Sequence, residues 1–356
     1  MEEPEEYRRS IIGRGAVGNP KNRFERIEVE PKREGSEAEE PGPETIYLRD
    51  VSRSIIARND SPDIGFDASI NPYRGCSHGC IYCYARPMHE YLGFSAGLDF
   101  ESRILVKENA PELLRKELSS PRWEPRVLAM SVATDCYQPV EKKLQLTRRC
   151  LEVIVEFRNP VAVVTKNHLV TRDIDLLSEL AHHNAAVAMV SLTTLDDDLR
   201  RVMEPRTSRP ARRLAAIEAL AQAGIPVGVM VAPTIPGLTD HEIPTLLSAA
   251  AKAGASFAAY TSVRLPYAVA PLFEDWLKRH FPERKEKVLN RIRSIRGGKL
   301  NDPGFGSRMR GEGIFAEQLG QLFSISCRRA GIWEKRSPKL STVAFRKAGP
   351  QPTLFD

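Results

Sequence analysis

Three cysteines lie close together in the segment INPYRGCSHGCIYCYARP. Cys76, Cys80 and Cys83 have the spacing C-x3-C-x2-C, and Gly75 and Gly79 favour a compact loop in which three thiolates can converge. Three thiolates on a four-iron cluster leave one iron without a protein ligand, and an open coordination position is where chemistry can occur. The spacing therefore predicts an iron–sulfur cluster with one open iron.

A structural zinc site is the first alternative to this cluster. Zinc is held by four ligands, commonly in two paired knuckles of the C-x2-C type. The sequence has no second cysteine pair beside these three, His78 lies between two of them, and His89 is only a candidate fourth ligand. Burial of the thiols as core packing is the weaker alternative, because Gly, Tyr and Arg surround them. The spacing favours the cluster over both.

The elements that must position these cysteines alternate regularly between residues 67 and 265. Short β-rich runs such as VLAMSVAT and VGVMVAP are apolar almost throughout, as parallel strands buried on both faces are. Between them lie helix-length amphipathic segments, so six βα repeats predict an α/β fold, either a parallel barrel or an open doubly wound sheet. The predicted strands are 67–73, 126–134, 161–166, 186–194, 227–233 and 257–265. The predicted helices are 111–119, 143–157, 172–183, 210–223 and 240–253.

Composition and residue pattern together divide the chain into four parts. Residues 1–45 are rich in Glu, Gly and Pro without apolar periodicity, which predicts a flexible arm. Residues 46–265 form the expected barrel, and residues 266–335 form a basic helical region with helices at 271–296 and 312–330. Residues 336–356 are polar and contain prolines, which predicts a flexible tail.

Charge is distributed unevenly along the chain. The net charge is +6, yet residues 1–45 carry −4 and residues 264–347 carry +11. A clustered basic surface can bind phosphate backbones, which makes nucleic acid a candidate partner of the C-terminal region. The alternative is a solvated helical face without a partner.

Two function classes are excluded by composition. The sequence contains no run of ~18 uninterrupted apolar residues, so we expect no membrane span and no membrane partner. The first residues, MEEPEEYRRS, lack an apolar stretch of the kind found in secretory signals. We therefore expect a cytoplasmic protein whose cysteines are reduced and serve as ligands, nucleophiles or core residues.

The cysteine segment resembles the radical S-adenosylmethionine superfamily, in which C-x3-C-x2-C follows the first strand of a partial (β/α)6 barrel. The residue before the third cysteine is commonly aromatic there, and here it is Tyr82. Together with ATDCYQPVEKKLQLTRRCLEVI, the segment is similar to the branch related to spore photoproduct lyase, a DNA-repair enzyme. The stretch from Gly13, with its GRGA and RFE fragments, is similar to a bacterial subgroup of that branch.

The resemblance implies a [4Fe–4S] cluster that receives one electron from an external reductant and passes it to S-adenosylmethionine. Cleavage gives methionine and a 5′-deoxyadenosyl radical, which abstracts hydrogen from a substrate. It further implies a lyase-like or repair activity on nucleic acid. Two alternatives stay open: radical modification of tRNA or protein, and a non-catalytic nucleic-acid-binding protein that holds zinc or a cluster.

Residues of the cofactor site also follow from the resemblance. The lyase contacts its cofactor through a lysine at the end of one strand and a serine on the next, and Lys166 and Ser191 match those places. Many relatives carry a Gly-Gly-Glu turn after the second strand. This chain has TDCYQPVE there, so Asp135 or nearby carbonyls must serve. Glu204, Arg206 and Arg213 could grip the ribose or the methionyl carboxylate, or form a basic surface turn. Tyr82 completes the predicted cofactor set.

The remaining cysteines differ in their expected roles. The lyase keeps a hydrogen-donating cysteine after the second strand, and Cys136 is the candidate here, with burial as a plain core thiol as the alternative. Cys150 lies on the apolar face of a predicted helix, and Cys327 lies near a helix end, so both are expected to be core residues.

The chain ends in QPTLFD, with two adjacent apolar side chains after a polar run. Gln351, Leu354 and Phe355 resemble the short peptides that dock DNA-repair enzymes onto the bacterial sliding clamp. A chance match, or Leu354 and Phe355 folding back on the chain, is the alternative.

Overall fold

The computed structural model describes residues 10–25, 43–334 and 337–347. Its centre is a sheet with the strand order β11-β10-β9-β8-β7-β6-β3-β2, in which all neighbouring pairs are parallel except the antiparallel pair of β2 with β3. The six predicted strands are confirmed as β3 and β6 to β10, within a partial barrel. The bounds are β2 Ile56–Arg58, β3 Ala68–Ile70, β6 Leu128–Met130, β7 Val161–Thr165, β8 Ala186–Ser191, β9 Val227–Thr234, β10 Phe257–Ser262 and β11 Trp333–Glu334.

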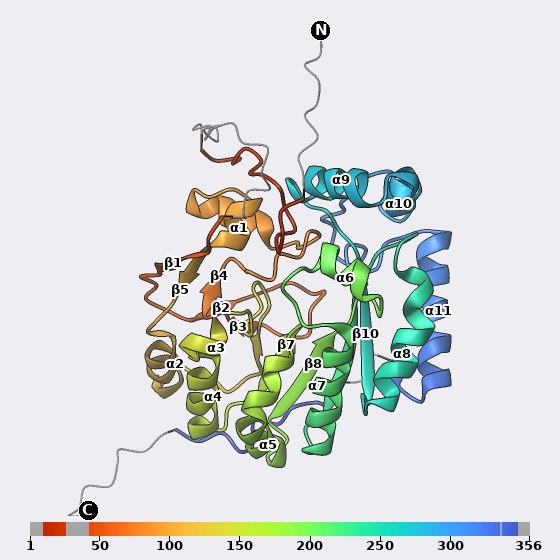
Figure 1. Ribbon diagram of the computed structural model, residues 1–356. Helices are drawn as coiled ribbons and strands as arrows, with labels where there is room; N and C mark the ends of the chain where they lie inside the picture. The colour runs from red at the N-terminus through yellow and green to blue at the C-terminus, as the bar shows by residue number, and fades with distance from the viewer. Residues whose placement is uncertain (1–9, 26–42, 335–336, 348–356) are drawn as a thin grey trace, which may run out of the picture.

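Helices cover the outer face of this sheet (Figure 1). Each lies between consecutive parallel strands, as crossover connections require. The covering helices are α2 Ala110–Ser119, α4 Leu146–Phe157, α5 Ile174–His182, α7 Pro210–Gln222, α8 Ile243–Lys252 and α11 Ile314–Ala330. Their apolar faces and the strands form one large core, to which Cys150 and Cys327 contribute as expected. No helix in the described ranges is long and apolar enough to cross a membrane.

Two predicted helices are interrupted. The helix expected at 143–157 is split into α3 (Glu141–Leu144) and α4, because Gln145 adopts a left-handed conformation with φ of 53°. The helix expected at 271–296 is split into α9 (Val269–His280) and α10 (Lys285–Ser294), with the turn η4 (Pro282–Arg284) between them. Pro282 has no N–H to continue the helical bonding of α9.

Other elements lie outside the predicted pattern. A second, three-stranded sheet has the order β1-β5-β4 and lies beside the barrel. The helix α6 follows β8 and is capped by Asp196, which accepts bonds from the N–H groups of Asp198 and Leu199. These elements are β1 Ile46–Arg49, β5 Arg103–Val106, η1 Arg86–Leu92, α1 Leu98–Ser102 and α6 Asp197–Met203. Three short elements overlap predicted ranges: β4 Tyr73–Arg74 the strand 67–73, η2 His168–Asp173 the helix 172–183, and η3 Asp240–Glu242 the helix 240–253.

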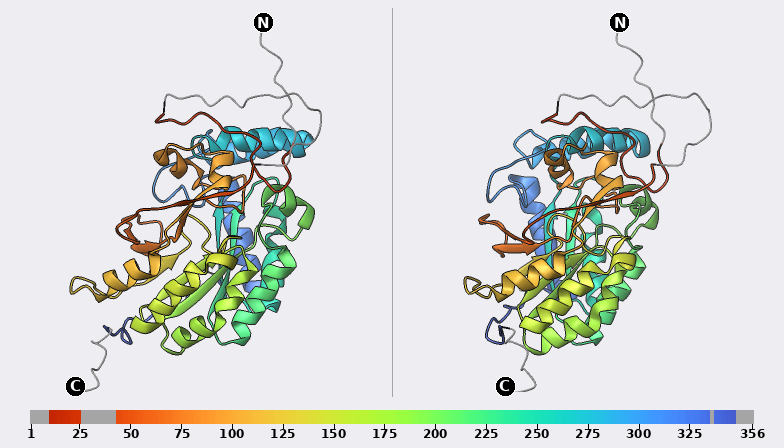
Figure 2. Two further views of the ribbon diagram at one scale, coloured as in Figure 1. Left: turned by 60° about the vertical axis from the view of Figure 1, so that its left-hand side comes forward. Right: turned by 90° about the vertical axis from the view of Figure 1, so that its left-hand side faces the viewer.

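The basic region 266–335 packs against the barrel in two places. Leu319, Phe323 and Cys327 form one stripe of α11 and join the barrel core, and β11 extends the sheet at β10. The other pair, α9 and α10, lies across the end of the barrel that also carries α6 and the N-terminal arm (Figures 1 and 2). The region is helical as predicted, and it is a continuation of the βα pattern.

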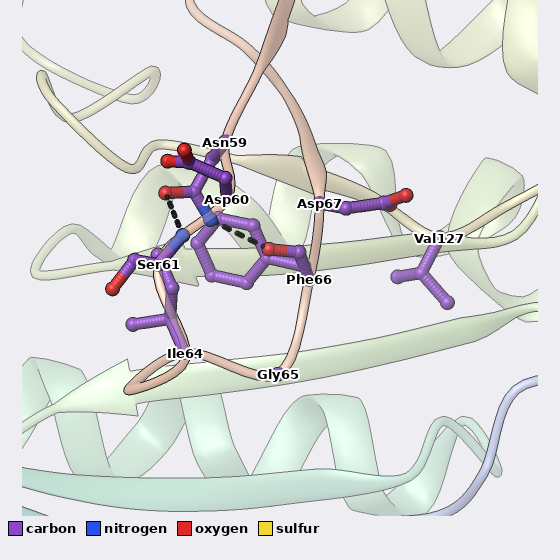
Figure 3. Close-up of a pocket in the computed structure, with 8 residues that line it drawn as sticks. All are labelled: Asn59, Asp60, Ser61, Ile64, Gly65, Phe66, Asp67 and Val127. Carbon is purple, nitrogen blue, oxygen red and sulfur yellow. Dashed lines mark hydrogen bonds between the residues drawn. The ribbon is translucent and has the colours of Figure 1, made fainter. Parts of the chain in front are cut away.

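The open side of the barrel is bridged by side chains. The bend between β2 and β3 meets the loop after α10, where Arg308 contacts Asp63 and the Gly306 N–H donates to Asp63 Oδ1 at 2.7 Å. An open hollow lies in the same bend, and Asn59 crosses it to accept from the Ser61 N–H and to donate to the Phe66 carbonyl (Figure 3). None of the predicted site residues lines this hollow.

The described parts of both predicted flexible segments pack against the barrel. In the arm, residues 13–16 lie behind the cysteine loop, where Ala16 is fully buried. In the tail, the Arg346 N–H donates to the Phe157 carbonyl at 2.9 Å, and Phe345 stacks on Phe157 with ring centres 6.3 Å apart. Gln351, Leu354 and Phe355 lie outside the described residues.

One buried carboxylate holds the arm in place. Glu101 of α1 has no exposed surface and accepts the N–H groups of Gly15 at 3.0 Å and Ala16 at 2.9 Å. It also pairs with the fully buried guanidinium of Arg86. Arg14 donates from the arm to the Glu101 carbonyl at 2.7 Å and to Thr45 Oγ1 at 3.0 Å. The arm therefore satisfies a charge that the barrel alone would leave incompletely paired.

We expect Glu101→Gln to lower the free energy of unfolding by about 3 kcal/mol, because it leaves the buried Arg86 without a counter-charge. The measurement is urea denaturation of the apoprotein. The control is Glu112→Gln, which removes an exposed ion pair with Arg149 of 2.8 Å and should cost less than ~1 kcal/mol. If both variants lose the same free energy of unfolding, the buried Glu101–Arg86 pair contributes no more to stability than the exposed pair.

Candidate active site

The three cysteines lie in one loop at the carboxyl end of the first barrel strand, where barrel enzymes place their sites. Within the loop, the Cys76 N–H donates to the Phe100 carbonyl at 2.9 Å, and the Cys83 N–H donates to the Cys80 carbonyl at 3.3 Å. None of the three forms a disulfide, and Cys76 and Cys80 are buried. The loop is thus fixed by its backbone, and its thiols are free to act as ligands.

Arg86 and two glycines shape this loop from behind. Arg86 donates to the carbonyl oxygens of Cys80 at 3.0 Å and Gly79 at 3.2 Å. A Cβ atom on Gly15 of the arm would lie only 2.0 Å from the Gly79 carbonyl oxygen. Gly79 itself has a φ of +70°, which favours glycine. The glycines of the arm and the loop are therefore required by a close backbone approach.

The donor set fits an iron–sulfur cluster. Burial raises the pKa of all three thiols, so each needs a compensating positive charge to ionise. A cluster supplies such charge, since a coordinated thiol is deprotonated. Two cations of the chain act in the same direction, because Arg86 and Lys166 oppose the rise at Cys83. Cys76, Cys80 and Cys83 would hold three of the four irons.

The described residues bring no further ligand to the three cysteines. In residues 10–25, 43–334 and 337–347, no group of three or more His, Cys, Asp and Glu side chains is arranged to hold a single metal ion. His89, the candidate fourth ligand, is buried with its Nε2 atom 3.0 Å from the Arg103 carbonyl oxygen.

His78 connects the cysteine loop to the next two strands. Its Nε2 atom lies 3.1 Å from the Asn167 amide nitrogen, which can only donate, so Nδ1 carries the proton and points to Asp135 at 3.4 Å. Burial lowers the pKa of His78, which keeps the ring neutral. Asp135 also accepts from Thr165 Oγ1 and from the Lys166 N–H, both at 2.8 Å. Asp135 therefore joins the ends of β6 and β7 to the loop.

Four of the predicted cofactor residues gather around a fifth, Glu204, which has no exposed surface. The Tyr82 hydroxyl donates to it, Arg213 pairs with it, and Lys166 Nζ lies 3.3 Å from its Oε1 atom. Ser191 joins through its carbonyl, which accepts from Arg213 at 3.1 Å. The group is completed by Thr193, whose hydroxyl donates to Glu204 at 2.8 Å. Sequence reasoning missed Thr193, although it lies two residues beyond Ser191 on the same strand end.

Two cations face one carboxylate in this group. Burial alone would raise the pKa of Glu204, but the charges of Arg213 and Lys166 outweigh it and hold the pKa well below its usual value. Burial and then the Glu204 charge raise the pKa of Tyr82, which keeps its proton. Glu204 is therefore a carboxylate at neutral pH, and it fixes the Tyr82 ring beside the cluster ligands.

The two cations of the group differ in their exposure and in their hydrogen bonds to the chain. Arg213 is 1% exposed, and its nitrogens are used within the chain, by Glu204, Thr207, Ser191 and Ser208. Four of its five N–H donors are used in this way, so Arg213 serves mainly to position Glu204. Lys166 keeps 16% of its side chain exposed and donates to the Ala232 carbonyl at 2.9 Å. Lys166 is the better placed cation for a ligand.

Two predicted site residues lie apart from the group. Arg206 faces the arm, where its guanidinium reaches Thr45 Oγ1 at 3.3 Å and packs beside Gly13. Cys136 has no exposed surface, belongs to the main core, and has Ser131 and Thr147 as hydrogen-bonding neighbours. This geometry favours the core-thiol alternative for Cys136, because a hydrogen donor must reach a substrate.

The low pKa of Glu204 predicts a pH-dependent contribution to stability. A carboxylate with a depressed folded-state pKa stabilises the fold above the unfolded value of about 4.3, and the contribution is lost as the pH falls through the folded value. Glu204→Gln should therefore cost about 3 kcal/mol at pH 7 and progressively less below pH ~4.5. Urea denaturation at several pH values checks this, with exposed Glu218→Gln as the control. A cost that stays constant with pH would contradict it.

Comparison with known proteins agrees with the site and the fold. A family model, the radical SAM superfamily, matches residues 70–250. The uncharacterized protein Rv2578c of Mycobacterium tuberculosis is 37% identical over 248 residues, covering 69% of this chain and 72% of that protein. The radical SAM Nalpha-GlyT isomerase of Pseudomonas phage M6 is 28% identical over 216 residues, covering 60% of this chain and 43% of the isomerase.

Among solved structures, spore photoproduct lyase complexed with dinucleoside spore photoproduct has a TM-score of 0.58 and 19% identity, covering 82% of each chain. This likeness shows a shared fold. The match of the family model, which spans half of the chain, agrees with the three-cysteine loop. The chain therefore belongs to the radical S-adenosylmethionine superfamily, whose members use a [4Fe–4S] cluster and S-adenosylmethionine.

Proposed function

We propose that the substrate of this radical S-adenosylmethionine enzyme is nucleic acid, on which it performs a lyase-like or repair reaction. The observation that carries the enzymatic part is the loop of three free thiols at the carboxyl end of β3, beside the partly buried cation Lys166. Two facts support the substrate class. The structurally similar lyase was solved with a dinucleoside photoproduct, and residues 264–347 carry a net charge of +11.

The residues divide the work of holding the cofactors. Cys76, Cys80 and Cys83 would hold the cluster, and Lys166 and Ser191 would contact S-adenosylmethionine. The bound cluster would supply one electron for cleavage of S-adenosylmethionine to methionine and a 5′-deoxyadenosyl radical, which would take hydrogen from the substrate. That electron comes from an external one-electron reductant.

The chain's own part is positioning and the exclusion of water. Tyr82 is held by Glu204, and Ile81 and Met203 belong to the apolar cluster behind the loop. The Ile81 N–H donates to the Met203 carbonyl at 3.1 Å, which closes the loop against α6. A reactive radical needs such a dry, rigid surround, because water and mobile side chains offer competing reactions.

We expect Cys76→Ala, Cys80→Ala and Cys83→Ala each to lose the cluster, because three ligands are the set that the loop provides. The measurement is anaerobic iron and sulfide analysis after reconstitution, with reductive cleavage of S-adenosylmethionine as the readout of activity. Cys327→Ala, a buried cysteine of α11, is the control and should retain both. Full iron content in any loop variant would contradict the assignment.

The same analysis separates the alternatives. About four irons and four sulfides per chain support the cluster, whereas one zinc without visible absorption supports a non-catalytic zinc protein. Reductive cleavage measured with DNA, with tRNA and with protein then separates the substrate classes. Product formation on protein alone would overturn the nucleic-acid proposal.

The clamp-binding tail is a second, separable proposal. Gln351, Leu354 and Phe355 lie outside the described residues, so the proposal rests on their sequence alone. Burying Leu354 and Phe355 would contribute ~3–5 kcal/mol before ordering costs, which suits a micromolar contact. Titration of a purified sliding clamp should show binding by the full chain and none by the Leu354→Ala/Phe355→Ala variant. If the full chain and the variant bind the clamp equally, Leu354 and Phe355 do not form the clamp-binding site.

A further inference from the structure

Exposed aromatic side chains gather beside the cysteine loop. Phe24 of the arm is 53% exposed, Tyr91 of η1 is 72% exposed and Tyr267 after β10 is 65% exposed. Phe24 and Tyr91 lie with ring centres 4.7 Å apart, and the Arg23 guanidinium lies 3.8 Å from the Tyr267 ring centre and 5.0 Å from that of Phe24. Arg23 thus contacts the rings of Phe24 and Tyr267, and Tyr91 joins them through Phe24.

A second group of rings continues this arrangement. The Arg264 guanidinium lies 4.7 Å from the Tyr84 ring centre, and the Arg308 guanidinium lies 4.6 Å from that of Phe305. Tyr84 is 39% exposed, and its hydroxyl donates to the Val132 carbonyl. The exposed part of Tyr84 is therefore its ring, while the hydroxyl is used within the chain. Phe305 is 63% exposed.

The two groups meet at the loop after β10. Arg264 and Tyr267 are three residues apart, so their backbones lie within about 11 Å of each other. Tyr84 directly follows the cluster ligand Cys83. The aromatic strip, defined as Phe24, Tyr84, Tyr91, Tyr267 and Phe305, therefore extends from the cluster ligand outward over the arm on one side and the open side of the barrel on the other.

Ordinary surface structure does not account for the strip. Isolated exposed aromatic residues are common, but here all the large exposed aromatic side chains of the described residues except Tyr47 belong to it. Arg23 is held by Glu90 at 2.7 Å, and Arg308 is held by Asp63, so these guanidinium planes are fixed in position. Fixed planes interleaved with exposed rings form a preorganised surface.

The chemistry of the strip identifies its occupant. Bases of a single strand stack on aromatic rings and on guanidinium planes, while the arginines attract the phosphates. Bases of a duplex are already stacked on each other and cannot do so. A membrane would meet arginines between the rings, and an acidic protein surface would leave the ring faces unused. Extraction from the stack is also what enzymes acting on a base require.

We propose that the aromatic strip binds unpaired nucleotides of a single-stranded nucleic acid and leads them to the cluster, an inference that rests on the proposed function. The test uses the anaerobically reconstituted full chain and fluorescein-labelled oligonucleotides, a twelve-nucleotide dT strand and a duplex of equal length, by anisotropy at fixed salt. We expect the single strand to bind at least tenfold more tightly than the duplex.

The variant Tyr91→Ala/Tyr267→Ala should weaken single-strand binding at least tenfold, because stacking contributes about 1–3 kcal/mol per base. The salt dependence should change little, because phosphate contacts remain. The control is Tyr47→Ala on β1, which removes an exposed ring outside the strip and should bind like the parent chain. Unchanged iron content shows that each variant is folded.

Each other outcome has a definite meaning. Oligonucleotide binding that the double variant leaves unchanged, or equal binding of strand and duplex, overturns the strip and leaves the proposed function standing. Absence of binding to DNA and RNA in any form overturns both. A double variant that binds oligonucleotides normally but is reduced more slowly by an acidic electron-carrier protein assigns the strip to the reductant, and overturns the proposal as well.

Discussion

The buried charge of Glu101 is the constraint on which the cysteine loop depends. Burying a carboxylate costs several kcal/mol of desolvation free energy, which its ion-pair and hydrogen-bond partners must offset. Glu101 has three sources of compensation, namely Arg86 and the N–H groups of Gly15 and Ala16. Because Arg86 also donates to the carbonyls of Gly79 and Cys80, the same network that satisfies the charge fixes the backbone between the first two cysteines.

Glu204 acts from the other side of the loop. It draws Tyr82 of the loop, Lys166 after β7 and Arg213 of α7 to one point, so three βα units and the cluster ligands share a single buried charge. Between the two carboxylates the loop is also bonded through its backbone, by Ile81 to Met203 and by the Arg206 N–H to the His78 carbonyl. A loop fixed on both sides can hold three thiols at the spacing that a cluster requires.

Sequence reasoning succeeded where one local pattern decides the structure. The six strands are continuous apolar runs, and the three cysteines share one short motif, so the strands and the loop could be predicted from neighbouring residues. It failed where distant residues decide. The docking of Gly15 behind Gly79 depends on the charge of Glu101, eighty-six residues away. Arg213 was predicted to face a cofactor, yet a buried Glu204 uses its donors, because pairing a buried charge outweighs leaving an arginine free.

On the open side of the barrel, one residue both bridges the fold and contacts the aromatic strip. A partial barrel leaves two sheet edges unpaired, and such edges need cover. Here the cover is a side-chain bridge, in which Arg308 contacts Asp63 of the β2–β3 bend and at the same time lies over Phe305. Closing the barrel with side chains leaves Phe305 exposed beside Arg308, whereas direct pairing of the edge strands β2 and β11 would fill this gap. The single strand proposed above would approach the carboxyl ends of the strands along this side, which a closed barrel would prevent.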